Sequence, residues 1–380
     1  MADTPIRVGF VGAGANTRKH HIPKLKAQSG VELVAVANRS KESGERVAKE
    51  LGIARVEDDW RRVVEARDVD AICIGTWPYM HRELTVAALT AGKHVLCEAR
   101  MAMNAAEGRE MLAASRKAPQ LVAQLVPAPH TLEVDRVLKT LLAEGWAGEV
   151  HAVEVQGTQQ GRFAELGDAM HWRQDRRLSG NNILNMGIWY EAMMRWLGSA
   201  RRVMAMTKIA KPKRKDDTGA WQDVKVPDHV DLLVNFSTSV GHLRFSSLTA
   251  FAPPPEAWIF GSDGTLHVEV DARRLTGARR GDQAMAEIVI PADQRIGWRV
   301  EEEFVNAIRG REKITHTNFE DGVRYMEFTD AVAKSYASGQ AVDVKDLSRP
   351  SSRCRARASA SRSSRPRASC WPAPACRSRS

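Results

Sequence analysis

A Gly-rich turn between an apolar strand and a helix restricts the fold of this chain more than any other feature. Residues 6–11, IRVGFV, read as a buried strand, residues 12–17, GAGANT, as the turn, and HHIPKL as part of a helix. A second apolar run, VELVAVA, follows, and the later runs AICIG and HVLCE are separated by helical patterns. Short buried strands that alternate with helices form right-handed βαβ units. The pattern predicts an α/β domain with a parallel sheet over residues 1–125.

The position of this turn, after a strand and before a helix, is the one that a dinucleotide-binding fingerprint requires. Gly12 permits the tight turn, and Gly14 lets the backbone approach a pyrophosphate, which the N–H groups of the helix N-terminus attract. Thr17 stands where a third Gly or Ala is usual, so the match is loose, and the alternative is a plain strand-to-helix turn. We expect the turn to bind a nucleotide cofactor through Gly12, Ala13, Gly14, Asn16 and Thr17.

The residues after the second strand bear on which nicotinamide cofactor binds. A carboxylate at this position would bond the ribose 2′-hydroxyl of NAD and repel a 2′-phosphate. The chain has Asn38, Arg39 and Ser40 here, and a guanidinium can pair a phosphate bidentately. The sequence therefore favours NADP, with NAD as the alternative, because Arg39 could equally lie in solvent or stack on adenine.

The formal net charge of +10 comes almost entirely from the C-terminal tail. Residues 347–380 contain nine of the 56 Lys and Arg residues and none of the 46 acidic residues, so the rest of the chain is nearly neutral. We therefore expect no nucleic-acid partner. A Ser/Arg/Ala/Pro-rich segment cannot bury a core and should be disordered. It is either a basic interaction tail or, as we favour, the product of a shifted reading frame.

Other signals exclude several classes of protein. No apolar run approaches the length of a membrane span, and the N-terminus reads as a strand and not as a signal peptide. We therefore expect a cytoplasmic protein without a membrane partner. Cys73 and Cys97 lie in predicted buried strands, and no metal-type cysteine spacing occurs outside the tail, so no metal site is expected.

Longer motifs define a family resemblance over about residues 5–344. The most specific motif is GTWPYMHRELTVAALTAGKHVLCE, and AEGWAGEVHAVEV, IFGSDGTLHVEV and EEEFVNAIRG support it. With these motifs the chain resembles the glucose–fructose oxidoreductase/inositol dehydrogenase/rhizopine-catabolism (Gfo/Idh/MocA) family. The resemblance implies a Rossmann domain followed, over residues 126–346, by an α/β domain with a large, open, mostly antiparallel sheet. One face of that sheet would line the substrate pocket, and the other would join the subunits of a dimer or tetramer.

The resemblance also places residues at the cofactor cleft. It implies that the cleft is lined after the fourth strand by Thr76, Trp77, Pro78 and His81, and that Glu98 ends the fifth strand. His81 has a second interpretation as a polar residue in the first turn of a helix.

Two stretches of the second domain have readable patterns. Residues 229–250 alternate partly between apolar and polar residues around a central turn, which is typical of a hairpin. Pro212 and the run KPKRKDD read as a solvated loop between strands.

The catalytic pattern implied by the resemblance is broken after Glu98. Family dehydrogenases usually place Lys-Pro there, with the lysine between nicotinamide and substrate, where it can lower the pKa of the reacting alcohol and relay its proton. This chain has Ala99 and Arg100. Alanine offers no proton, and a guanidinium stays protonated, so Arg100 could stabilise an anion but not act as a base.

The second half of the usual site is also altered. The family pattern is Asp-x-Gly-x-His with another acid three residues later, at the start of a helix. Here Asn185 replaces the Asp, Gly187 is kept, Trp189 replaces the His and Ala192 replaces the following acid.

Other residues near this stretch are candidates for the missing chemistry. We expect His171 or Glu191 to be the base, with Asn185 orienting the reacting hydroxyl; the alternatives are a hydrogen-bonded loop residue for His171 and a solvated helix residue for Glu191. Arg173 either holds a substrate carboxylate or forms a surface ion pair. Further substrate contacts are expected from Arg100, Asn181, Asn182 and Trp189.

The sequence thus predicts an NAD(P)-dependent oxidoreductase with a non-standard proton relay. Its substrate would be a sugar, cyclitol, polyol or hydroxylated ring acid. Two alternatives stay open, a non-redox lyase, decarboxylase or glycoside-cleaving enzyme that keeps the nucleotide, and a regulatory protein that binds the nucleotide without turnover.

Overall fold

The computed structural model describes residues 4–158, 163–164 and 166–345. The predicted tail, 347–380, lies outside the described residues. Within the described part of the chain, no helix combines the length and apolar character that a membrane span needs.

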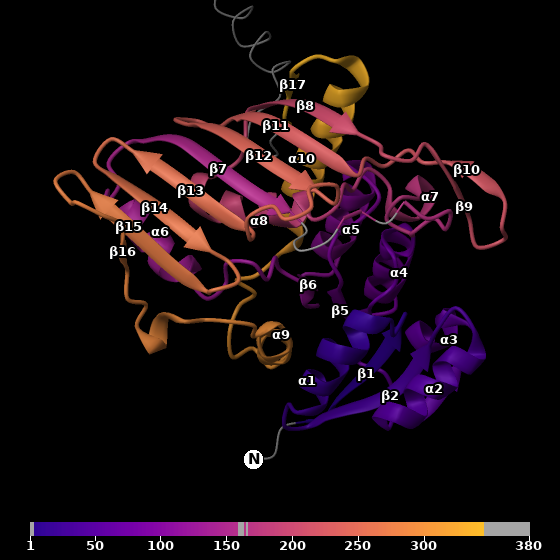
Figure 1. The fold of residues 1–380 in the computed structure, drawn as a ribbon. Helices are drawn as coiled ribbons and strands as arrows, with labels where there is room; N and C mark the ends of the chain where they lie inside the picture. The colour runs from indigo at the N-terminus through magenta and orange to yellow at the C-terminus, as the bar shows by residue number, and fades with distance from the viewer. Residues whose placement is uncertain (1–3, 159–162, 165, 346–380) are drawn as a thin grey trace, which may run out of the picture. The chain divides into compact units, whose positions relative to one another are not determined.

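The N-terminal part forms a six-stranded parallel sheet, which confirms the predicted Rossmann architecture (Figure 1). In spatial order its strands are β3 (Arg55–Glu57), β2 (Val31–Ala37), β1 (Ile6–Val11), β4 (Ala71–Ile74), β5 (His94–Cys97) and β6 (Ala123–Leu125). The chain order reverses direction between β1 and β4, and open α/β sheets bind ligands at the carboxyl ends of the strands beside such a switch point.

Local sequence explains where the helices of this domain begin. They are the π-helical turn η1 (Thr17–His21), α1 (Ile22–Lys26), α2 (Lys41–Leu51), α3 (Trp60–Glu65), α4 (Pro78–Thr90) and α5 (Ala105–Lys117). Ser40 caps α2, since its hydroxyl accepts a hydrogen bond from the Ser43 N–H. Pro78 occupies the first position of α4, where its missing N–H costs no helical hydrogen bond. Asn104 caps α5 through the Glu107 N–H.

The second domain contains a nine-stranded sheet that is antiparallel except between β7 and β12, as predicted. In spatial order its strands are β16 (Ala286–Glu287), β15 (Arg274–Arg279), β14 (Gly264–Glu269), β13 (Glu256–Gly261), β7 (Val150–Thr158), β12 (Val240–Ser246), β11 (His229–Asn235), β8 (Arg202–Lys208) and β17 (Val342–Asp343). Strands β11 and β12 pair as a hairpin, which confirms the expectation from their alternating residues.

The predicted solvated loop after Pro212 is wrong. Strands β9 (Lys213–Lys215) and β10 (Trp221–Asp223) form a separate two-stranded sheet. Arg214 is buried there, and its guanidinium donates to the Gly167 and Ala169 carbonyl oxygens. Sequence analysis did not detect β9, because a strand of three residues is too short to show an alternation of apolar and polar residues. Its charged residues are also typical of a loop.

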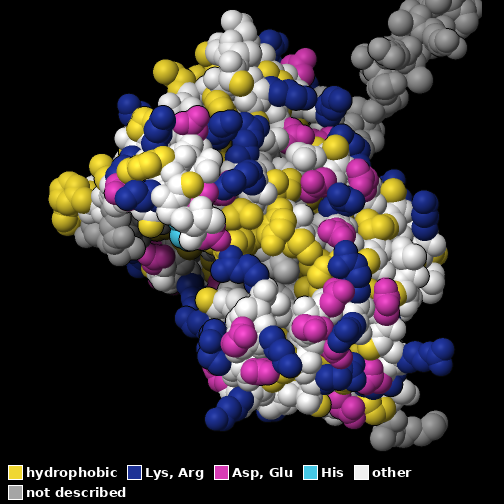
Figure 2. Space-filling view, turned by 90° about the vertical axis from the view of Figure 1, so that its right-hand side faces the viewer, with side chains coloured by type: hydrophobic (Ala, Val, Ile, Leu, Met, Phe, Trp, Pro, Cys, Tyr) yellow, Lys and Arg dark blue, Asp and Glu magenta, His cyan; other side chains and the backbone are white. Residues whose placement is uncertain are grey.

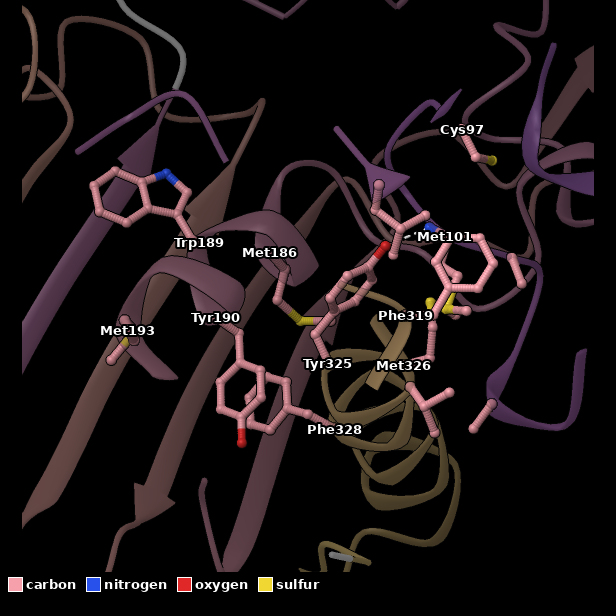
Figure 3. Packing of buried hydrophobic residues seen from close by; sticks show 14 of the residues in the cluster. Cys97, Met101, Met186, Trp189, Tyr190, Met193, Phe319, Tyr325, Met326 and Phe328 are labelled. Carbon is pink, nitrogen blue, oxygen red and sulfur yellow. Dashed lines mark hydrogen bonds between the residues drawn. The ribbon is translucent and has the colours of Figure 1, made fainter. Parts of the chain in front are cut away.

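Helices cover one face of the nine-stranded sheet (Figure 1). These are α6 (Asp135–Ala143), α8 (Met186–Leu197) and α10 (Phe319–Ser338), and the short α7 (Arg176–Ser179) precedes α8. Tyr190 of α8 stacks on Phe328 of α10 with ring centroids 3.8 Å apart (Figure 3). The hydroxyl of Tyr325 accepts a hydrogen bond from the Met101 N–H, which ties α10 to the loop after β5.

The last part of the described chain returns to the Rossmann domain. Helix α9 (Val300–Ile308) places Val300, Phe304 and Val305 in the same buried cluster as Ile22 and Leu25 of α1. Helix α10 packs against α5. The predicted division at residue 125 therefore separates two sheets but not two independent cores.

Charges of both signs are interspersed on the face of the molecule drawn in Figure 2, and hydrophobic side chains gather across its middle. This face shows no field of a single charge, in keeping with the balanced charge of the chain before its tail.

Candidate active site

The glycine turn after β1 has room for a ligand where the sequence predicts a pyrophosphate. Gly12 has a φ of +83°, and a Cβ there would lie 2.5 Å from the Thr76 side chain. A Cβ on Gly14 would meet, among the described atoms within 4 Å, one carbonyl oxygen of Gly75 at 3.9 Å. The backbone is thus tightly enclosed at Gly12 and open at Gly14, which fits the close approach of a phosphate.

Thr17 packs inside this turn instead of facing the open side. It is buried, and a Cβ added to Gly75 would lie 2.0 Å from its hydroxyl oxygen. Thr17 therefore makes the helix–strand contact that the third small residue of the fingerprint usually makes. It packs there and does not make the cofactor contact that the sequence predicted.

The end of β2 presents amide and guanidinium groups and no carboxylate. Asn38 Oδ1 accepts a hydrogen bond from the Ala13 N–H at 2.7 Å, and its amide donates to the Ser43 hydroxyl. Arg39 is exposed, with its guanidinium 5.6 Å from the centre of the Trp77 ring and 3.9 Å from the Asp217 carboxylate. Ser40, predicted to contact the cofactor, caps α2.

The segment after β4 carries an unsatisfied polar atom at the cleft. The Thr76 hydroxyl is buried and has no hydrogen-bond partner in the part of the chain that the structure describes. Trp77 stacks on Trp172 of the second domain, with ring centroids 5.6 Å apart and planes 13° apart. A buried hydroxyl without a partner is costly unless a ligand or water satisfies it, so Thr76 fits a cofactor contact.

His81 and Pro78 hold the backbone of the cleft. The His81 ring is fully buried, with Nε2 2.9 Å from the Thr76 carbonyl oxygen and Nδ1 2.9 Å from that of Arg100. Burial lowers the pKa of His81, while the carbonyl oxygens that both ring nitrogens face act in the opposite direction. The sequence placed His81 at the cofactor. In the structure His81 instead joins the loop after β4 to the loop after β5.

Glu98 directly follows β5 and belongs to a buried charge cluster. His21 lies between two carboxylates, with Nε2 2.9 Å from Glu98 and Nδ1 2.6 Å from Glu301 of α9. Asn16 donates its amide to Glu98, and the Trp298 indole donates to Glu301 at 2.9 Å. Burial opposes the charge on His21, but its bonds to the two carboxylates outweigh burial and raise its pKa to about 9. His21 is therefore a cation at neutral pH.

Ala99 and Arg100 follow at the position where two cavities meet. The cavities are about 750 and 720 Å³ in volume, within the range of small-molecule sites. Arg100, Arg173 and Ile188 border both of them. The first cavity also touches Asn16, Glu98 and Ala99, and the second lies over β7 and β12 of the large sheet.

Four of the predicted substrate-site residues meet at the second cavity. They are Arg100, His171, Arg173 and Asn185. His171 is exposed, and its Nδ1 accepts a long hydrogen bond of 3.3 Å from the Arg173 N–H. Partial burial and the neighbouring Arg173 lower the pKa of His171, so the ring is neutral at pH 7.

Glu191 and Trp189 lie in the core and not at either cavity. The buried Glu191 carboxylate accepts hydrogen bonds from the Ala128 N–H, the Thr317 hydroxyl and Arg195. Trp189 has no exposed surface, and its ring stacks on His130. The structure does not support the predicted base role of Glu191 or the stacking role of Trp189, because both side chains are buried and neither borders either cavity.

Asn181 and Asn182 also have structural partners. Asn182 is buried and donates to the carbonyl oxygens of Ala102 and Ser179. Asn181 donates to Asp330 of α10. These amides hold the segment before α8 in place. Their role is therefore structural, and not the substrate contact that the sequence predicted.

Sequence analysis missed His21 and Glu301, whose pairing completes the charge cluster at Glu98. They are separated by 280 positions, so no local pattern could pair them. The double histidine directly after the glycine turn was the available signal. Among the described residues, no group of three or more His, Cys, Asp and Glu side chains is arranged to hold a metal ion.

A dinucleotide turn at a switch point, facing a substrate cavity over a second sheet, defines a two-domain nucleotide-dependent oxidoreductase. Models of the oxidoreductase family's NAD-binding Rossmann fold and of the GFO/IDH/MocA C-terminal domain match residues 6–124 and 136–267. The chain belongs to the Gfo/Idh/MocA oxidoreductase family.

Individual relatives agree with this assignment. The chain is 28% identical to 1,5-anhydro-D-fructose reductase of Ensifer adhaerens over 354 residues, 89% of this chain and 98% of that protein. It is 30% identical to inositol 2-dehydrogenase of Serratia proteamaculans over 145 residues, 38% of this chain and 43% of that protein. A structure of levoglucosan dehydrogenase with NADH and L-sorbose superposes with a TM-score of 0.80 at 21% identity, covering 90% of this chain and 100% of that one.

The family assignment settles the class of reaction. The protein is an oxidoreductase that uses a nicotinamide cofactor and acts on hydroxylated small molecules. The open Gly14 backbone and the unsatisfied Thr76 hydroxyl are the places in this chain that fit the cofactor.

Proposed function

We propose that the enzyme interconverts a secondary alcohol and a ketone on a sugar-like substrate, with His171 moving the proton that the absent lysine would otherwise relay. The supporting observation is the content of the second cavity, which shares Arg100, Arg173 and Ile188 with the cavity beside Ala99. Of the described titratable residues that border the second cavity, His171 is neutral and exposed, whereas the two oxygens of Asp228 accept from the Gln174 side chain and the Ala210 N–H.

The proposed step divides the chemistry between cofactor and protein. When bound, the nicotinamide accepts the hydride that leaves the alcohol carbon, and the hydroxyl proton passes to the imidazole as the C=O bond forms. The long bond from Arg173 N–H to His171 Nδ1 and the exposure of the ring allow its tautomers and protons to exchange with solvent. Asn185 lies at the same cavity and orients the reacting hydroxyl through its amide.

The test of this function uses the full chain. NADH and NADPH are titrated by fluorescence, and sugars, cyclitols and polyols are then screened by absorbance at 340 nm and by mass spectrometry of the products. We expect cofactor reduction with a ketone product two mass units lighter than its substrate, as hydride transfer requires. An altered product without any absorbance change would replace this proposal with the non-redox alternative.

Substitution of His171 tests the proton transfer. We expect His171→Gln to lower kcat/KM for oxidation by roughly 10²–10⁴-fold, the usual contribution of a general base. The base must be unprotonated, and its pKa lies below the ordinary 6.5, so wild-type activity should fall only as the pH drops below that value. The variant should lose this acidic limb. His151→Gln, an exposed histidine on β7, is the control, and an unchanged pH profile in His171→Gln would remove the residue from the mechanism.

For the cofactor, we propose a preference for NADP over NAD. Arg39 is exposed at the end of β2, the strand end is free of carboxylates, and Asn38 is held by Ala13 and Ser43. A 2′-phosphate would gain the guanidinium as a partner in competition with Asp217, and would meet no carboxylate at the strand end itself. In the titration above, NADPH should therefore bind more tightly than NADH.

We also propose that the enzyme is a homo-oligomer through the outer face of its large sheet. Residues facing away from the helices include Met206, Leu233 and Val240, which are 72%, 61% and 57% exposed. Neighbouring exposed apolar side chains on a sheet mark an interface. Leu233→Glu should lower the mass in solution, measured by light scattering, to that of a monomer. Val289→Glu, at an exposed residue outside the sheet, should not change it.

A further inference from the structure

Arg100 is a buried cation that Glu98 attracts without forming an ion pair with it. Its side chain is 5% exposed and makes no ion pair with any residue that the structure describes, and its Nε atom has no hydrogen-bond partner there. Burial and repulsion from Arg173 lower the pKa of Arg100 to about 10, so it is charged at neutral pH. A buried charge without a partner is strongly unfavourable, and an anionic ligand would relieve it.

The nearby acids are already engaged. Glu98 is bound by His21, Asn16 and the Ala99 N–H. Asp228, on the second cavity, accepts from Gln174 and Ala210. Arg100 and Arg173 thus place two positive charges on the wall between the two cavities, and Asp228, whose donors are neutral, keeps its negative charge at the second cavity.

The N-terminus of α8 meets this wall. A Cβ added to Gly187, in the first turn, would lie 3.7 Å from Arg100 Cδ. Asn185, the N-cap, makes no side-chain hydrogen bond to the helix, and it borders the same cavity as Arg100 and Ile188. The Met186 N–H donates to the Ile183 carbonyl oxygen, so the first-turn N–H groups that could meet an anion are those of Gly187 and Ile188, which have no partner within the helix. The helix dipole also favours an anion there.

We propose that the substrate is a hydroxylated carboxylic acid, such as a uronic or aldonic acid, whose carboxylate binds between the Arg100 guanidinium and the N-terminus of α8. The planar guanidinium matches a carboxylate bidentately, and the first-turn N–H groups lie on the helix beside it. This inference rests on the proposed oxidoreductase function and specifies its substrate. Asn185, which stands where the family pattern has an aspartate, carries no negative charge that would repel a carboxylate at this position.

The experiment compares acids with their neutral counterparts on the full chain. D-glucuronate, D-galacturonate and D-gluconate are compared with D-glucose, D-galactose and D-glucitol, and D-glucose 6-phosphate is included as a phosphorylated probe. Binding is measured by calorimetry with saturating NADP⁺, and turnover by absorbance at 340 nm. We expect at least one acid to bind roughly tenfold or more tightly than its neutral counterpart, as a charge-assisted bond contributes.

Two substitutions locate the carboxylate. Arg100→Met keeps the length of the buried stem and removes the charge, and should weaken binding of the acid by roughly tenfold to a hundredfold. Asn185→Asp places a negative charge at the helix start, where Asp is a good N-cap and preserves folding. It should weaken binding of the acid by a larger factor than binding of the matched neutral sugar, because only the acid is repelled by the new charge. Arg280→Met removes an exposed guanidinium far along the chain, at the end of β15, and should leave acid binding unchanged.

Each outcome decides the proposal. Equal binding of acids and neutral sugars, or tighter binding of the phosphorylated probe, would overturn the carboxylate assignment while leaving the oxidoreductase function intact. If Arg100→Met weakens the binding of NADPH as much as it weakens the binding of the acid, Arg100 contacts the cofactor and the inference fails. Acid binding without any change at 340 nm in the wild type would instead count against the proposed function and support the anion site.

Discussion

Replacing His21 with leucine is expected to lower the free energy of unfolding by about 3–5 kcal/mol, the usual cost of removing one partner of a buried ion pair. His21 has no exposed surface and is the cation between Glu98 and Glu301. Leucine would leave both carboxylates without their shared partner. Chemical denaturation followed by circular dichroism measures the effect, and His20→Leu, next to it in the same helical turn and half-buried, is the matched control.

The pH dependence of stability identifies the cause. The pKa of His21 is raised from 6.5 to about 9 on folding, so its contribution is fully present below pH 6.5 and is lost as the pH rises through 9. Wild-type stability should therefore decline between these values, by up to about 3 kcal/mol. The leucine variant should lack this decline. A variant with the same alkaline decline as the wild type would show that another group causes it.

A substitution of Gly12 by alanine is expected to abolish cofactor binding under ordinary assay conditions, raising the Kd for NADPH by roughly a hundredfold or more. The new Cβ would lie 2.5 Å from the Thr76 side chain and 2.6 Å from its backbone N, at a φ of +83° that L-residues avoid. The turn would have to move, and with it the N–H groups that receive the pyrophosphate. Fluorescence titration measures the Kd, and thermal unfolding reports the accompanying strain.

Gly145 provides the matched control for this substitution. Its φ of +74° imposes the same backbone penalty, but a Cβ there would have no described atom within 4 Å. Gly145→Ala should therefore cost stability without weakening NADPH binding. Equal affinities for Gly12→Ala and the wild type would mean that the cofactor does not use this turn.

The parts of the fold that sequence analysis predicted correctly are those encoded by neighbouring residues. The run IRVGFV is buried on both sides as β1, and the turn after it reverses the chain through Gly12, so the pattern and the structure depend on the same few residues. The hairpin of β11 and β12 likewise follows from residues that alternate along each strand. Local patterns of this kind are independent of the rest of the chain.

The site residues were harder to predict, because their roles depend on partners distant in sequence. Helical spacing places Glu191 beside Arg195, four residues later, but it gave no sign that the pair would be buried against Thr317 and the Ala128 N–H. A carboxylate in a helix looks the same from sequence whether it faces solvent or a core. The absence of a lysine at position 99 could be read directly from the sequence. The free charge of Arg100 could not, because it depends on Glu98 being occupied by His21.

The return of α9 and α10 to the Rossmann domain has a consequence for how the protein is made. A ribosome that has synthesised the first 299 residues has released every strand of the nucleotide-binding sheet but not the helix that buries Ile22 and Leu25. The apolar patch around Ile22 and Leu25 on the nascent cofactor domain therefore stays exposed until nearly the whole chain has emerged. Chaperones would meet this patch during synthesis, and any transplantation of the cofactor module into another protein must carry α9 with it.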